Sequence, residues 1–215
     1  MRITTQAKQQ TRQRLLKTGA RLFRKRGFAA TTTREIAEAA GIANGTLFNY
    51  FPTKESLALT LFAEALAGAE GDFVSRNGGG SVEEDLYAFI MAGLHRLESY
   101  RQYAGDVLAT VMSPFARAGA CPEAEEMRRT HLESVLEILQ AHHIIEATAG
   151  DRDLFVQLHL YWTIYLGVIA FWSRDESPDH TDTLVVLDQS LRLLLGSLPT
   201  PSPDSSSQHE EVSRD

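Results

Sequence analysis

The segment 32–47 constrains the fold most, because it encodes two short helices joined by a tight turn. Thr32 and Glu35 match a capping box, so a helix is predicted to begin directly after Thr32. Gly41 ends this helix, since glycine supplies the left-handed conformation that reverses the chain. A further short helix is predicted over about 44–50. The pattern indicates a helix-turn-helix, whose second helix enters the DNA major groove, although an ordinary helical hairpin uses the same residue types.

Helical periodicity also dominates the rest of the chain, where strict alternation of apolar and polar residues is absent. Thr53, Ser81 and Asp151 are suitable N-cap residues, and Pro122 suits the first turn of a helix. Helices are predicted over about 8–26, 54–75, 81–99, 152–174 and 181–196, with another from Pro122 and shorter helical stretches up to about residue 114. The chain is therefore predicted to be all-α.

Charge is distributed unevenly along the sequence. Residues 1–67 hold 11 Lys and Arg against four acids, a net charge of +7. Residues 68–215 hold 10 arginines against 24 acids, a net charge of −14. A basic front segment on an acidic chain indicates a polyanion-binding module, with a merely solvated basic face as the alternative.

The composition argues against other classes of protein. The single cysteine, Cys121, excludes an internal disulfide framework and favours a cytoplasmic protein. The first 13 residues are polar, unlike a secretory signal, and the nearly apolar run 160–172 is shorter than the roughly 20 residues that span a membrane. We therefore expect no membrane partner.

Candidate sites for metal or covalent chemistry are weak. His142, His143 and Glu146 offer too few ligands at a fixed spacing for a metal site, and a solvated helix end explains them as well. Cys121 has no neighbouring base in the sequence that would make it a nucleophile. We expect no metal, no cofactor and no enzymatic activity.

The sequence over 31–57, TTTREIAEAAGIANGTLFNYFPTKESL, strongly resembles the DNA-binding domain of TetR-family transcriptional regulators. The resemblance covers about residues 8–60, and beyond it is one of architecture only. It implies a three-helix DNA-binding domain over 1–53, with a disordered arm over 1–7. A helical bundle for effector binding and dimerisation would follow over 54–198, and then a disordered tail over 199–215.

The resemblance implies a cytoplasmic homodimer that binds double-stranded operator DNA, usually represses transcription and is released by a small molecule. Two alternatives remain at this stage: an interaction protein that has lost DNA binding, and an enzyme carrying a fused helix-turn-helix. The residues expected to contact DNA are Thr32, Thr33, Asn44, Gly45, Thr46, Asn49, Tyr50 and Lys54.

Several of these residues have a chemical reason to contact DNA. Asparagine pairs with an adenine edge, and Thr32 or Thr33 at a helix N-terminus can meet a phosphate or simply cap the helix. Lys54 is a cation at a helix N-terminus, which is unfavourable for the helix dipole, so a phosphate partner would explain it. Four basic residues could add DNA backbone or minor-groove contacts from the N-terminal arm, or could be solvated, disordered charge: Arg2, Lys8, Arg12 and Arg14.

Two positions depart from the family pattern. Ala43 stands where serine is common, so a helix cap is lost. Phe48 stands where tyrosine is common, so it loses a hydroxyl and is predicted to have a packing role only. The expected recognition helix has no Arg or Lys, which makes readout through asparagine, small groups and DNA shape the expectation.

The predicted helix over 152–174 is apolar on nearly all sides, so we expect one side in the core and another in a dimer seam with 181–196. The residues assigned to the dimer interface are Leu184, Leu187, Leu191 and Leu194. The candidates for effector binding are Phe89, Met112, Phe115, His159, Tyr161, Trp162 and Tyr165, with plain core packing as the alternative for each. These side chains suit an apolar or aromatic effector, and the acidic body is compatible with a lipophilic cation.

Overall fold

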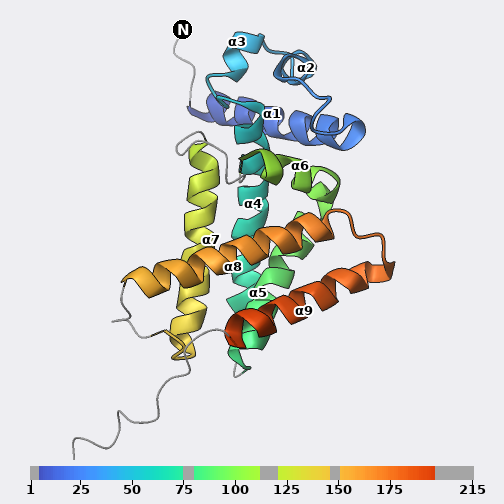
Figure 1. Cartoon of the computed structure of the whole chain (residues 1–215). Coiled ribbons are helices and arrows are strands. Elements are labelled where there is room, and N and C mark those ends of the chain that lie inside the picture. Colours follow the sequence, from blue (N-terminus) through green and yellow to red (C-terminus); the bar gives the residue numbers. More distant parts are fainter. Residues whose placement is uncertain (1–4, 75–79, 112–120, 146–150, 197–215) are drawn as a thin grey trace, which may run out of the picture.

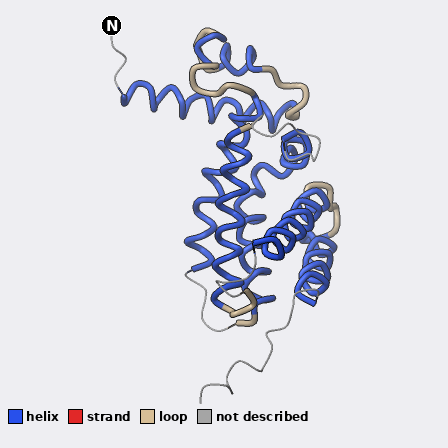
Figure 2. Tube along the Cα trace, turned by 60° about the vertical axis from the view of Figure 1, so that its left-hand side comes forward, coloured by secondary structure: helices blue, strands red, loops and turns tan. Residues whose placement is uncertain are grey.

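The computed structural model describes residues 5–74, 80–111, 121–145 and 151–196, and every regular element in these ranges is helical (Figures 1 and 2). The long helices are α1 (Thr5–Arg26), α4 (Lys54–Val74), α5 (Val82–Leu97), α6 (Arg101–Val111), α7 (Pro122–Ala141), α8 (Asp151–Trp172) and α9 (Thr181–Gly196). The short ones are α2 (Thr33–Ala39) and α3 (Asn44–Leu47), with 3₁₀ turns at Glu98–Tyr100 and Pro178–His180. The predicted all-α fold is confirmed.

The helix starts follow the predicted caps with one exception. The Thr32 hydroxyl accepts from the Glu35 amide at 3.2 Å, and the Glu35 carboxylate accepts from the Thr32 amide at 2.9 Å. Ser81 heads an equivalent box, and the Thr53 hydroxyl accepts from the Ser56 amide at 3.0 Å. The exception is Asp151, which is the first residue of α8 and not its cap.

Helices α1, α2 and α3 form a head whose small core includes Leu16, Phe23, Ile36 and Leu47. Gly41 between α2 and α3 has a φ of 69°, so the left-handed turn predicted there is confirmed. Helix α1 already begins at Thr5, so residues 5–7 are helical, whereas the sequence suggested a disordered arm. Residues 1–4 and the predicted tail over 199–215 lie outside the described residues.

Helix α4 connects the head to the body. It packs on α1 near its start and runs down the body between α5 and α7, as Figure 1 shows. Helices α8 and α9 pack side by side on one flank of these long helices (Figures 1 and 2). The head and the body are therefore linked by one continuous helix.

Helix α8 is apolar on most sides, but only one of its faces is buried. Its stretch from Leu154 to Trp172 is long and apolar enough to cross a membrane by composition, and 28% of this stretch is buried. The inner face includes Tyr161, Trp162 and Tyr165. Its exposed large apolar side chains are Phe155, Val156, Leu160 and Phe171.

The structure corrects the assignment of α9 residues to a dimer interface. Leu187, Leu191 and Leu194 are buried within the chain, because spacings of four and three place them on the helix face that packs on α5 and α8. Leu184 is half-buried. The exposed apolar side chains of α9 are instead Val185 and Leu193, whose exposed fractions are 60% and 76%.

Candidate DNA-binding surface and effector pocket

The segment after Gly41 presents polar side chains on a fixed apolar anchor. Leu47 is fully buried, while Asn44, Gly45 and Asn49 are exposed and Thr46 is half-buried. Helix α3 ends at Leu47, earlier than predicted, but the Tyr50 and Phe51 amides still donate to the Leu47 carbonyl at 2.9 and 3.0 Å. The turn therefore holds Asn49 beside the helix. As predicted, Ala43 caps α3 with no side-chain hydrogen bond.

Phe48 lies on this same surface. Its side chain is 45% exposed, so it packs against the chain only in part. A ring exposed beside Asn44 and Asn49 offers an apolar contact for a thymine methyl group. The exposure of Phe48 could have been predicted from the sequence, because Phe48 directly follows Leu47 and cannot share its face.

Lys54 has an intramolecular partner that the sequence did not reveal. Its Nζ donates to the Phe28 carbonyl at 2.8 Å and lies 4.2 Å from the centre of the Phe28 ring. These contacts explain a cation at the start of α4 without a phosphate. One of the three ammonium donors is used, so two are left for a DNA backbone. Tyr50 is half-buried close by in sequence.

The positive charge of the head lies mainly along α1. Lys8, Arg14, Lys17 and Arg21 are exposed, and the last three line a shallow hollow of about 530 Å³. By contrast, the Arg26 guanidinium is 2.6 Å from the Glu35 carboxylate, and Arg34 is similarly paired with Glu38. Residue Arg2 lies outside the described residues.

Arg12 points away from this basic face and toward the body. Its Nη1 is 2.7 Å from Glu64 Oε1 on α4, and its guanidinium lies 5.5 Å from the Phe51 ring centre. The structure thus places Arg12 at the joint between head and body, a position that neither of the two sequence-based alternatives, DNA contact or solvated charge, included. The Glu64 end of this ion pair belongs to the wall of a pocket.

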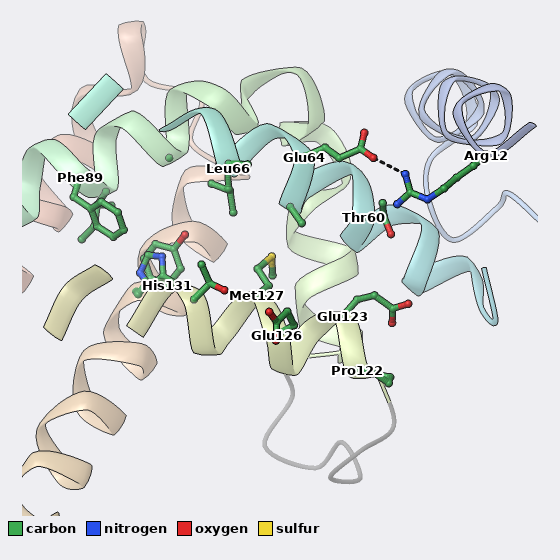
Figure 3. Close-up of a pocket in the computed structure, with 16 residues that line it drawn as sticks. Arg12, Thr60, Glu64, Leu66, Phe89, Pro122, Glu123, Glu126, Met127 and His131 are labelled. Carbon is green, nitrogen blue, oxygen red and sulfur yellow. Dashed lines mark hydrogen bonds and ion pairs between the residues drawn. The ribbon is translucent and has the colours of Figure 1, made fainter. Parts of the chain in front are cut away.

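A pocket of about 660 Å³ lies between α4, α5 and α7, and its lining includes Tyr165 of α8. Phe89, Leu66 and His131 lie at one end, and Thr60, Glu64, Glu123 and Arg12 lie at the other, as Figure 3 shows. Met127 and Glu126 come from α7 between the two ends. The pocket therefore has an apolar, aromatic end and a charged end.

His131 occupies the centre of an aromatic cluster. Its ring centroid lies 4.1 Å from that of Tyr165 and 5.0 Å from that of Phe89. Its Nε2 is hydrogen bonded to the Tyr161 hydroxyl at 2.9 Å. Burial disfavours the imidazolium and lowers the pKa of His131 from 6.5 to about 3, so this ring is neutral at physiological pH.

The carboxylates at the charged end have different partners. Glu64 pairs with Arg12, and Glu126 is held by Arg129 at 2.5 Å, which lowers the pKa of Glu126. Glu123 accepts a hydrogen bond from the Ser56 hydroxyl, in the first turn of α4. It also accepts from the Cys121 thiol at 3.5 Å, and burial raises the pKa of that thiol.

Two family profiles match the chain in succession: "Bacterial regulatory proteins, tetR family" over residues 15–61, and "Tetracyclin repressor-like, C-terminal domain" over residues 86–200. The second covers more than half of the chain. This chain belongs to the TetR family. The first profile extends into α4, beyond the predicted domain boundary at residue 53.

Solved and curated TetR-family relatives align along most of the chain. The structure of the Thermus thermophilus repressor FadR, in complex with lauroyl-CoA, has a TM-score of 0.62 and 26% identity, covering 89% of this chain and 97% of FadR. The repressor KstR of Mycolicibacterium smegmatis is 23% identical over 92% of this chain and 93% of its own length. Shorter matches are closer in sequence: YerO of Bacillus subtilis is 43% identical over 75 residues, which cover 35% of this chain and 24% of YerO.

Within this TetR-family body, the pocket includes only part of the predicted effector set. Of that set, Phe89 and Tyr165 line the pocket, whereas Tyr161 and Trp162 are buried without lining it, and His159 is exposed on α8. Met112 and Phe115 lie outside the described residues. His131 was not among the predicted residues. It nevertheless lies four residues after Met127 and four before Val135, on the apolar stripe of α7.

The described residues hold no group of three His, Cys, Asp or Glu side chains suited to a metal ion. His142 pairs instead with Asp85, its Nε2 lying 2.7 Å from Oδ2. Glu146, the third residue weighed with it, lies outside the described residues.

Proposed function

We propose that this chain is a cytoplasmic transcriptional repressor that binds operator DNA as a homodimer and is released by a small organic effector. The observation that carries the proposal is the continuous path from the exposed Asn44–Asn49 surface, through α4, to the 660 Å³ pocket. Helix α4 follows directly after the proposed DNA-contacting surface and also lines the ligand pocket. An effector-controlled switch needs both parts joined in this way. The chain acts by binding and not by catalysis.

The dimer is supported by the apolar surface that α8 and α9 leave uncovered. Phe155, Val156, Leu160, Phe171, Val185 and Leu193 are large and exposed in the single chain. A surface of this kind is typical of an interface. A two-fold arrangement places two heads on half-sites about 34–36 Å apart, as a symmetric operator requires.

The effector is supported by the shape and chemistry of the pocket. Phe89, Met127 and Tyr165 provide walls for an apolar or aromatic group, and polar side chains at the other end can orient it. FadR was solved with a ligand that has both an acyl tail and a polar head. The effector must prefer the protein conformation whose heads do not fit the operator, because equal affinity for both would release nothing.

A DNA-binding titration tests the proposal. The full chain is mixed with labelled DNA from upstream of its own gene, and retention is compared with that of a scrambled duplex. Asn49→Ala should relax preference at one base position by about 1–3 kcal/mol, whereas Gln140→Ala, at an exposed position near the end of α7, should leave it unchanged. Equal binding to both duplexes at physiological salt would contradict sequence-specific repression and favour an interaction protein.

A further inference from the structure

The pocket has one end that carries charge and one that does not. His131 is held neutral among Phe89, Tyr161 and Tyr165, so this end is aromatic and uncharged. All the acidic lining residues lie on α4 and α7, at or beside the opposite end (Figure 3). The sign of the charge that the pocket can accept is therefore set by Glu64, Glu123 and Glu126.

Within the described residues, only one of these three carboxylates lacks a cationic partner. Glu64 is paired with Arg12, and Glu126 with Arg129. Glu123 has the Ser56 hydroxyl and the Cys121 thiol as its partners, and both are neutral donors. No Lys, Arg or His of the described ranges forms an ion pair with Glu123. A half-buried carboxylate in this position favours a positively charged ligand group, because the attraction is stronger away from bulk water.

We propose that the effector is an amphipathic cation, whose ammonium or amidinium head binds between Glu123 and Glu64 and whose apolar tail lies against Phe89 and His131. This inference rests on the proposed effector role of the pocket and specifies its ligand class. The volume of about 660 Å³ is in the range of sites for drug-sized molecules.

The same head group provides a means of release. Arg12 belongs to α1 of the DNA-binding head, and it also lies over the ring of Phe51, which follows the recognition turn. Ser56 lies in the first turn of α4. A ligand cation that takes Glu64 from Arg12 removes a polar tie between the pocket and the head. If it also takes Glu123 from Ser56, it removes a tie between α7 and the first turn of α4, the helix that leads out of the head.

The proposal also separates this chain from an acyl-CoA sensor. The head of an acyl-CoA carries several phosphate charges, and Arg12 is the lining residue that offers a positive charge. That arginine is already paired, and the neighbouring acids repel phosphate. We therefore expect this chain to discriminate against the ligand class with which FadR was solved.

Calorimetric titration with ligands of one tail length tests the charge preference. Dodecyltrimethylammonium, 1-dodecanol, dodecanoate and lauroyl-CoA are each titrated, below micelle formation, into the full chain. We expect the cation to bind about tenfold or more tightly than the alcohol, and the two anions to bind more weakly than the alcohol. The advantage of the cation should shrink at high salt.

Charge-neutral variants locate the head group. Glu123→Gln keeps the shape and should cost the cation about tenfold in affinity with little effect on dodecanol. Glu64→Gln is the second variant and should act in the same direction. Glu137→Gln, an exposed position on α7 outside the pocket lining, is the matched control and should change neither ligand.

The outcomes separate the charge preference from the effector role. Equal or tighter binding of dodecanol or dodecanoate, with no effect of Glu123→Gln, overturns the cation and leaves the effector pocket in place. Failure of all four ligands to bind overturns both. In DNA titrations the bound cation should weaken operator binding by the wild type. The loss should be smaller in Arg12→Gln, because the Arg12–Glu64 ion pair is already absent there. A loss in Arg12→Gln equal to that of the wild type overturns the release route.

Discussion

Polar side chains of the head and of the pocket pair with partners at very different separations in the sequence. In the head, Thr32 and Glu35 pair across three residues and shape a single turn. In the pocket, Arg12 meets Glu64 across 52 residues, and Ser56 meets Glu123 across 67. The head is therefore encoded by local signals, whereas the pocket is created by helix packing. Local changes should affect the head alone, and changes in the body should appear in assembly, ligand binding and pH dependence.

The largest effect is expected in the core of the head. Leu47→Ala removes a fully buried side chain and should lower the free energy of unfolding by about 2–5 kcal/mol, because a cavity remains. Phe48→Ala, at the exposed neighbouring position, should change stability little and weaken DNA binding. Urea unfolding followed by circular dichroism measures the first effect, and a DNA titration the second. Equal destabilisation by both would contradict the burial described here.

The dimer prediction tests the exposed face of the body. Leu193→Asp places a charge in the proposed apolar seam and should shift the protein from dimer to monomer in light scattering at micromolar concentration, with the fold intact. Ala39→Asp adds the same charge to the exposed end of α2 and should leave the dimer unchanged. Leu187→Asp should instead unfold the protomer, since that side chain is buried within it. A monomeric wild type would refute the seam.

The neutral state of His131 predicts a pH dependence that belongs to the body. Its pKa is lowered to about 3, so the unfolded chain binds a proton below about pH 6.5 that the folded chain does not. Above pH 6.5 the free energy of unfolding does not depend on the titration of this residue. On acidification to pH 5 it falls by about 2 kcal/mol, at about 1.4 kcal/mol per pH unit. His131→Phe should lack this slope in urea titrations. Parallel slopes for the two proteins would show that the ring is protonated when folded.

The smallest effect is expected from supplying the missing cap. Ala43→Ser offers a hydroxyl to the free amides of α3 and should stabilise the head by about 1 kcal/mol. Ala39→Ser, in the last turn of α2, has no such amides to satisfy and serves as the control. Thermal unfolding of the two variants makes the comparison, and a gain no larger than that of the control would argue against the cap.

The sequence predicted what depends on neighbours in the chain. Caps at Thr32 and Ser81 and the turn at Gly41 were all expected, because each needs only three or four adjacent residues. The starts of α2 and α5 followed from these caps. The faces of α9 were misassigned, since an amphipathic leucine stripe does not reveal which partner it packs on.

The pocket was harder to predict for a related reason. Phe89 and Tyr165 were selected among other aromatic residues by residue type alone, so Tyr161 and Trp162 were equally plausible although they do not line the pocket. His131 was overlooked, and the Glu64 and Glu123 contacts join segments that no periodicity relates. The charge count predicted an acidic body but gave no information on which acids line a cavity.

The short and uncapped α3 has a consequence for the entropy of DNA recognition. Four helical residues secured chiefly by Leu47 leave several backbone groups to water, so this segment is expected to open more readily than α1 or α4. Part of the free energy gained on the operator is then spent on ordering the reading surface. Amide hydrogen exchange in this segment should slow markedly when DNA binds, because the bound operator holds the segment in its helical conformation.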